Sequence, residues 1–196
     1  MDIDYGFNPL RLYALCDQAM LDHAGISLES FIARCIDLNA EIIQYRNKSD
    51  NIEIIASQLT RLRSMWSKTL IVNDMLPLHK MCDGVHVGQE DLARIAADEK
   101  TAVGMIREIV GRKKLIGLST HDMDEILQAN GLDIDYIGLG AYRNTDTKSD
   151  AQVLSDSLDS LASISLHPVA AIGGVRLDDR FRHVTYNVIG SGLFVG

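Results

Sequence analysis

Short apolar runs alternate along the whole chain with longer segments in which apolar residues recur at spacings of three and four. Short runs rich in β-branched and aromatic residues are typical of strands, and the longer spacing is typical of amphipathic helices. The pattern predicts strands at Arg11–Cys16, Glu41–Arg46, Thr69–Asn73, Gly84–Val87, Leu115–Ser119, Tyr136–Gly140, Val169–Ile172 and Asn187–Ile189.

Helical segments are predicted between these strands. Phe31, Cys35 and Leu38 illustrate the apolar spacing, which turns one face of a helix toward a core. The predicted segments are Leu28–Leu38, Ile52–Trp66, a short turn near Leu76–Met81, Leu92–Val110, Met123–Gln128, Ala151–Ala162 and Leu177–His183.

The order of these elements predicts the fold class. Strand followed by helix, repeated about eight times within 196 residues, indicates an α/β fold of the TIM (β/α)8 barrel type, with a doubly wound open sheet as the alternative. No linker interrupts the pattern, so residues 1–196 are expected to form a single barrel domain. Because the sequence stops soon after the eighth strand, we expect a C-terminally truncated barrel with the eighth helix missing.

Composition narrows the location and the partners. No apolar run approaches the roughly 18 residues that a membrane-spanning helix needs, and the first residues are acidic where a signal peptide is basic, so a cytoplasmic protein with no membrane contact is expected. The formal charge of −8 argues against nucleic acid as a partner, because phosphate backbones are bound by an excess of Lys and Arg. An anionic ligand would need a locally basic or metal-assisted site.

The three cysteines, Cys16, Cys35 and Cys82, show neither a CxxC spacing nor a zinc-ligand pattern. We interpret them as buried thiols.

Polar residues gather where the predicted strands end, which is the catalytic face of a TIM barrel. In the second strand, the period of two places Gln44, Arg46 and Lys48 on one face and Tyr45 and Asn47 on the other. The alternative for the first three is a solvated edge strand.

Two aspartates follow the third and fourth strands, Asp74 and Asp91. Each is able to cap the helix that follows it. Near Arg46 and Lys48, however, two carboxylates also suit Mg²⁺, which usually takes one or two carboxylates and completes its shell with phosphate and water.

Later strand ends offer further candidates. His86 is expected to point inward, and Ser119 and His121 follow the fifth strand, where a histidine is more often structural than catalytic. Hydroxyls, an ammonium group and glycines suit a phosphate site, although tight turns also use such glycines. These residues are Thr145, Thr147, Lys148, Gly173, Gly174, Gly190, Ser191 and Gly192.

Six segments resemble, in order and approximate spacing, those of the thiamine phosphate synthase family: IIQYRNK, IVND, DGVHVGQED, LIGLSTH, DYIGLGAYRNTDTK and AAIGGV. The resemblance runs from about Leu12 to Phe194. It implies a TIM-barrel transferase of thiamine biosynthesis that requires Mg²⁺. Such an enzyme joins 4-amino-2-methyl-5-hydroxymethylpyrimidine diphosphate to hydroxyethylthiazole phosphate and releases diphosphate.

The resemblance also implies roles for the residues. Gln44 would contact the pyrimidine, His86 would line the cavity, and Asp74 and Asp91 would bind the metal. The diphosphate would be held by Arg46, Lys48, Asn73 and Lys148, with Ser119 nearby. The thiazole phosphate site would comprise Thr145, Thr147, Gly174 and Ser191.

The implied mechanism is dissociative, with Arg46, Lys48 and Lys148 as the catalytic residues that stabilise the departing diphosphate. Three alternatives stay open at this point. They are a thiazole tautomerase that uses His121, a non-catalytic paralogue that binds a thiamine precursor, and another phosphate-binding barrel enzyme whose carboxylates act as acid and base. Apolar surface left by a missing eighth helix also leads us to expect a homodimer.

Overall fold

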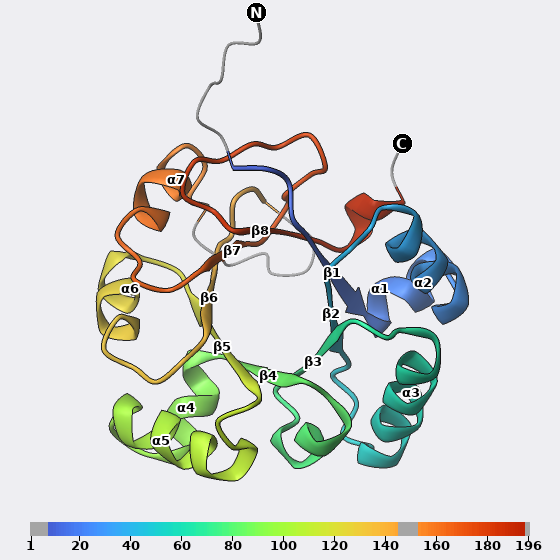
Figure 1. Cartoon of the computed structure of the whole chain (residues 1–196), viewed down its shortest axis with the longest axis horizontal. Coiled ribbons are helices and arrows are strands. Elements are labelled where there is room, and N and C mark those ends of the chain that lie inside the picture. Colours follow the sequence, from blue (N-terminus) through green and yellow to red (C-terminus); the bar gives the residue numbers. More distant parts are fainter. Residues whose placement is uncertain (1–7, 145–152, 195–196) are drawn as a thin grey trace, which may run out of the picture.

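Eight parallel strands close into a barrel in the order of the sequence, as Figure 1 shows. The computed structural model describes residues 8–144 and 153–194. The strands are β1 (Leu12–Asp17), β2 (Ile42–Arg46), β3 (Thr69–Asn73), β4 (Gly84–Val87), β5 (Leu115–Thr120), β6 (Tyr136–Leu139), β7 (Val169–Ala171) and β8 (Tyr186–Ile189). Because β1 pairs with both β2 and β8, the barrel is confirmed and the open sheet is wrong. Every strand boundary agrees with its prediction to within one residue.

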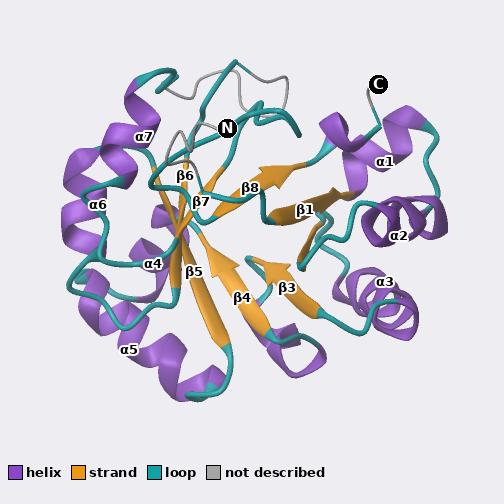
Figure 2. Cartoon of the chain, turned by 45° about the horizontal axis from the view of Figure 1, so that its top comes forward, coloured by secondary structure: helices purple, strands orange, loops and turns teal. Residues whose placement is uncertain are grey.

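The helices surround this ring of strands (Figures 1 and 2). They are α1 (Gln18–Ala24), α2 (Leu28–Asp37), α3 (Ile52–Met65), α4 (Gln89–Ile95), α5 (Glu99–Val110), α6 (Met123–Ala129) and α7 (Ser157–Ala162), with short 3-10 helices η1 (Leu76–Met81) and η2 (Ser191–Leu193). In the part of the chain that the structure describes, no helix has the length and apolar character to cross a membrane.

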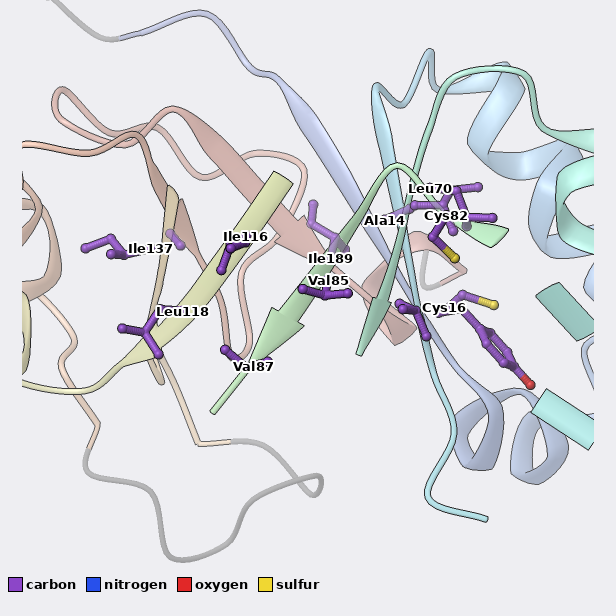
Figure 3. Packing of buried hydrophobic residues seen from close by; sticks show 14 of the residues in the cluster. Ala14, Cys16, Leu70, Cys82, Val85, Val87, Ile116, Leu118, Ile137 and Ile189 are labelled. Atoms are coloured by element: carbon purple, nitrogen blue, oxygen red, sulfur yellow. The ribbon is translucent and has the colours of Figure 1, made fainter. Parts of the chain in front are cut away.

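The alternation of side chains along each strand produces two apolar cores. On β4, Val85 and Val87 point out to the layer between strands and helices (Figure 3), whereas His86 between them contacts Tyr136 inside the barrel. The outer core also contains the three cysteines, which are buried and unpaired with one another, as predicted. The inner core is smaller and is formed by Tyr13, Ile42, Ile71, Tyr136, Ala170 and Val188. Polar side chains nearer the carboxyl ends of the strands lie above it.

The single helix predicted over Leu92–Val110 is wrong, because two helices occupy this stretch. Extended backbone at Ala96 ends α4, and the carboxylate of Asp98 then accepts the backbone N–H of Thr101 at 2.8 Å and starts α5. Because the residues on both sides favour a helix, the spacing of apolar residues alone does not reveal this boundary.

The helix predicted over Leu177–His183 is also wrong. Two backbone N–H groups that a helix would use internally are taken by a carboxylate from outside the segment, because Arg182 and His183 both donate to Asp159. The described residues between β7 and β8 therefore form turns rather than a helix.

Two further helix boundaries differ from prediction. The helix predicted over Ala151–Ala162 begins only at Ser157, and residues 151–152 lie outside the described part. Helix α1 was not predicted; it starts where Asp17 accepts the N–H of Met20 at 3.1 Å. After β8 the described chain reaches Phe194 through η2, so the missing eighth helix stays a prediction.

Candidate active site

Strand β2 delivers an amide and a guanidinium group to one end of the barrel, as the period of two predicts. Gln44 is buried, and Arg46 is partly buried two residues later. Arg46 Nη1 donates to the carboxylate of Asp17, its register partner on β1. Lys48 follows β2 at an exposed position. The structure therefore brings Gln44 and Arg46 to the mouth of the barrel and places Lys48 at its edge.

The two aspartates that follow β3 and β4 lie together. Asp74 adopts a left-handed conformation, with φ at 59°, and its carboxyl group lies near that of Asp91. Desolvation of the carboxyl group, followed by the negative charge and hydrogen bond of Asp91, raises the pKa of Asp74 to about 6. The positive charge of Arg46 opposes this rise.

Asp91 also has the capping role that the sequence left open. Its Oδ2 accepts the backbone N–H of Gly88 at 3.0 Å, and its Oδ1 accepts from Arg94 at 3.1 Å. Capping and cation binding are compatible, because a carboxylate has about four lone-pair positions.

The chemistry of this carboxylate pair suits Mg²⁺. Two carboxylates whose charges raise a pKa are relieved by a divalent cation. Within residues 8–144 and 153–194, no group of three or more His, Cys, Asp or Glu side chains is placed to hold a metal. A cation bound by this pair would therefore need water or substrate oxygens to complete its shell, as Mg²⁺ commonly does.

A hydrogen-bonded series of polar side chains lies between these groups and the inner core. Gln44 Nε2 donates to Asn73 Oδ1 at 2.6 Å, and Gln44 Oε1 accepts from the hydroxyl of Tyr13 at 2.6 Å. On the neighbouring strand β4, His86 is the register partner of Asn73 and contacts Tyr136 and Ser119, each at 3.0 Å. Thus the structure brings together Gln44, Asn73, His86 and Ser119, which the sequence singled out one strand at a time.

His121 has a local partner. Its Nδ1 lies 2.9 Å from Glu125 Oε2, and the same oxygen accepts its backbone N–H at 2.7 Å. The side chain is thus tied to the first turns of α6, which is the structural role that the sequence favoured. Nothing among these contacts favours the tautomerase alternative.

The glycines after β7 adopt a left-handed backbone conformation, which is compatible both with a phosphate loop and with a tight turn. Gly173 and Gly174 adopt φ values of 84° and 69°, which residues with a Cβ rarely adopt. The Gly174 carbonyl accepts from Arg143 Nη1 at 2.7 Å, and Arg143 is in turn held by Asp179. Ser191 lies at an exposed position where η2 begins. Three predicted residues, Thr145, Thr147 and Lys148, lie outside the described part of the chain.

Three residues at or below the site were missed in the sequence. Asp17 is only 5% exposed and holds Arg46, and the hydroxyls of Tyr13 and Tyr136 link Gln44 to His86. Asp17 has a sequence signal, since it ends a strand and precedes a helix. The tyrosines have none, because a buried tyrosine in a strand is most often part of a core.

Comparisons with known proteins identify the family. The family model described as thiamine monophosphate synthase matches residues 12–190. A thiamine-phosphate synthase of Persephonella marina is 35% identical over 172 residues, which make up 85% of this chain and 77% of the relative. One from Clostridium acetobutylicum is 29% identical over 201 residues, covering 100% of this chain and 88% of the relative.

A solved structure gives the same fold. The thiamine phosphate pyrophosphorylase from Pyrococcus furiosus superposes with a TM-score of 0.74 over 93% of this chain and 86% of its own, and at 22% identity this likeness concerns the fold alone. The family and the enzyme class, a transferase of thiamine biosynthesis, are those that the six motifs predict. From the family model and the curated relatives together, this chain belongs to the thiamine monophosphate synthase family.

Proposed function

We propose that the chain joins 4-amino-2-methyl-5-hydroxymethylpyrimidine diphosphate to hydroxyethylthiazole phosphate, giving thiamine phosphate and diphosphate. Membership of the family and the synthases among its relatives support this activity. The single observation that carries the division of roles is the Asp74–Asp91 carboxyl pair beside Arg46, because a carboxyl pair suits a metal ion and a guanidinium group suits a phosphate.

The diphosphate is held on the β2–β4 side of the barrel. Arg46 has further N–H groups beyond the one that Asp17 accepts, so it is able to donate to phosphate oxygens without leaving its partner. Lys48 adds a charge at the rim and Asn73 adds an amide N–H, while Ser119 on β5, whose hydroxyl contacts His86, lies near the diphosphate. Lys148 joins this set on the strength of the motif resemblance alone.

Asp74 and Asp91 hold Mg²⁺ in this proposal. When bound, the metal ion neutralises negative charge that grows on the departing diphosphate oxygens. The chain's own contribution is to keep the two carboxyl groups side by side at the strand mouth.

The reaction breaks the bond between the pyrimidine methylene carbon and the diphosphate oxygen, and the electron pair leaves with the diphosphate. The resulting methylene cation is stabilised by the aminopyrimidine ring, and the lone pair of the thiazole nitrogen then forms the new C–N bond. No protein nucleophile or proton transfer is needed, so the task of Arg46, Lys48 and Lys148 is electrostatic.

The thiazole phosphate lies on the opposite side of the mouth. Gly174 after β7 and Ser191 after β8 offer backbone and hydroxyl donors there, as TIM-barrel phosphate sites often do. Thr145 and Thr147 complete this proposed site. His86 lies between the two halves and lines the cavity.

The test is to mix the purified protein with both precursors, with and without Mg²⁺, and to follow thiamine phosphate and diphosphate by chromatography. Formation of both products only with Mg²⁺ is expected. Asp91→Asn should abolish it, whereas Glu90→Gln, one residue away on the exposed side of α4, should leave it unchanged.

Other outcomes would redirect the proposal. Binding of both precursors without product would favour a non-catalytic paralogue. Turnover that resists chelation would favour an acid–base role for the carboxylates. The homodimer is a separate proposal, and sedimentation as a monomer at micromolar concentration would contradict it.

A further inference from the structure

A continuous series of side-chain hydrogen bonds crosses the inside of the barrel from the carboxyl pair to β5. Its links are Asn73 to Asp74, Gln44 to Asn73 (2.6 Å), Tyr13 to Gln44 (2.6 Å), Tyr136 to Tyr13 (2.8 Å), His86 to Tyr136 (3.0 Å) and Ser119 to His86 (3.0 Å). We call this set the barrel network. Its members come from β1 to β6, or from the residue directly after one of these strands.

The direction of every bond follows from the amide of Asn73 at one end. Asn73 donates from its NH₂ group to Asp74, so its oxygen is the atom that accepts from Gln44. Gln44 then presents its NH₂ group to Asn73, and its oxygen accepts from the hydroxyl of Tyr13.

The remaining links continue in the same direction. Having donated its only hydrogen, Tyr13 accepts from Tyr136. Tyr136 accordingly accepts from Nδ1–H of His86, and Nε2 of His86 accepts from the hydroxyl of Ser119. Burial raises the pKa of Tyr13 and of Tyr136, so both hydroxyls keep the hydrogen that this arrangement uses.

The surrounding barrel encloses the side chains of the barrel network tightly. Tyr13 is 1% exposed and Tyr136 5% exposed. A Cβ added at Gly117 would lie 2.2 Å from Cζ of Tyr136 and 2.5 Å from Nδ1 of His86. Because only glycine leaves room for the two rings, their hydroxyl and imidazole groups have little freedom to move.

The barrel network fixes the orientation of the Gln44 amide and therefore the hydrogen bonds that it offers to a ligand. Each amide atom has a second hydrogen-bonding position: Oε1 has another lone pair and Nε2 has another hydrogen. An aminopyrimidine edge offers the complement, an N–H donor beside a ring-nitrogen acceptor. A 4-oxopyrimidine edge offers the reverse order, which a flipped amide would match.

We infer that Tyr13 and Tyr136 are positioning residues that fix the amide of Gln44 and thereby make the site select an aminopyrimidine over an oxopyrimidine. This inference rests on the proposed function, since it takes the aminopyrimidine diphosphate as the substrate. Neither tyrosine needs to touch the substrate, because each acts through the hydrogen bond to the next side chain.

The test uses three variants that each remove one phenolic hydroxyl. Tyr13→Phe removes the bond to Gln44 itself, and Tyr136→Phe removes a bond one step farther away. Tyr186→Phe is the matched control. The ring of Tyr186 also packs on the inner core, but its hydroxyl binds Arg11 and is not part of the barrel network.

For each protein, kcat and KM are measured with the aminopyrimidine diphosphate and with its 4-oxo counterpart, and the melting temperature is recorded. Loss of one buried hydrogen bond predicts that Tyr13→Phe raises KM for the aminopyrimidine substrate about tenfold and lowers the amino-over-oxo preference in kcat/KM about tenfold. Tyr136→Phe should change both about threefold, in the same direction. The KM for thiazole phosphate should stay within about twofold in every variant, because a changed orientation of the Gln44 amide does not alter the contacts of that substrate.

The inference is overturned if the amino-over-oxo preference of Tyr13→Phe stays within about twofold of that of Tyr186→Phe. Equal effects on both substrates, in step with a lower melting temperature, would also contradict it, because they mark a purely structural role. If Tyr13→Phe does not fold, the graded change expected of Tyr136→Phe decides the question. Failure of the wild-type protein to bind or turn over the aminopyrimidine diphosphate would instead refute the proposed function, so the two failures are distinguishable.

Discussion

The carboxyl groups of Asp74 and Asp91, which follow neighbouring strands β3 and β4, lie close enough together for the negative charge of Asp91 to act on Asp74. Desolvation and the negative charge of Asp91 raise the pKa of Asp74 from 3.8 to about 6. Ionisation of the pair is therefore unfavourable until a cation binds, and this makes both stability and metal binding depend on pH.

Asp74→Asn should stabilise the metal-free protein at pH 7.5 but not at pH 4. With the folded pKa raised, the folded state of the wild type binds more protons than the unfolded state between about pH 4 and 6, so its stability falls as pH rises through that window. An asparagine escapes this loss and still accepts from Asn73. Urea unfolding at the two pH values measures the difference, with the exposed Asp50→Asn as control. An equal effect of Asp74→Asn at both pH values would contradict the prediction.

Substitutions of Asp91 should separate its two roles. Asp91→Asn keeps an oxygen for the N–H of Gly88, so it should lose Mg²⁺-dependent turnover while the melting temperature stays close to that of the wild type. Asp91→Ala should lose the same activity and, in addition, about 1 kcal/mol of unfolding free energy, because the cap is removed. Turnover assays and thermal melts of both variants check this. Retained activity in Asp91→Asn would remove this residue from the metal site.

Arg46 and Asp17 allow substrate binding to be separated from stability. Arg46→Ala leaves Asp17 buried without its partner, so we expect a loss on the order of 3 kcal/mol in stability together with a higher KM for the pyrimidine diphosphate. The double variant Asp17→Asn/Arg46→Ala should recover most of the stability and none of the affinity. Denaturant unfolding and steady-state kinetics on the four proteins of this cycle provide the measurement. Recovery of affinity in the double variant would place Arg46 outside the diphosphate site.

Most of the scaffold was predictable from the sequence because strand burial and turn chemistry are local signals. The runs that became β3 and β4 were located to the residue, since each is short, apolar and bounded by polar residues. The helices were less predictable. The segment from Leu177 to His183 has a helical pattern of apolar residues, yet the carboxylate of Asp159 takes the N–H groups of Arg182 and His183.

For the site, the sequence identified residues that face the mouth but not those that support them. Gln44 and His86 stand out as polar residues in apolar strands, and the structure confirms that both point inward. Tyr13 and Tyr136 come from β1 and β6, which are far apart in the sequence, so no local spacing signals that their hydroxyls meet. Such contacts depend on closure of the barrel.

His121→Ala should leave synthase turnover within about twofold of the wild type, because its imidazole is held by Glu125 and the dissociative reaction needs no acid or base there. Stability should fall by less than about 1 kcal/mol, since the ion pair is partly exposed. Product formation and a thermal melt test both statements. A large drop in kcat at an unchanged melting temperature would revive the tautomerase reading.

Two glycine-to-alanine substitutions should act in opposite directions. Gly117→Ala places a methyl group 2.2 Å from Cζ of Tyr136, so it should cost roughly 1–3 kcal/mol of stability by overpacking. Gly104→Ala, on an exposed turn of α5 with nothing within 4 Å of the added carbon, should instead add about 0.5–1 kcal/mol through helix propensity. Because Gly117 also keeps the rings of His86 and Tyr136 in place, only its variant should lose preference for the aminopyrimidine. Urea unfolding and the substrate comparison test both points, and a neutral Gly117→Ala would mean that the rings adjust without loss of their hydrogen bonds.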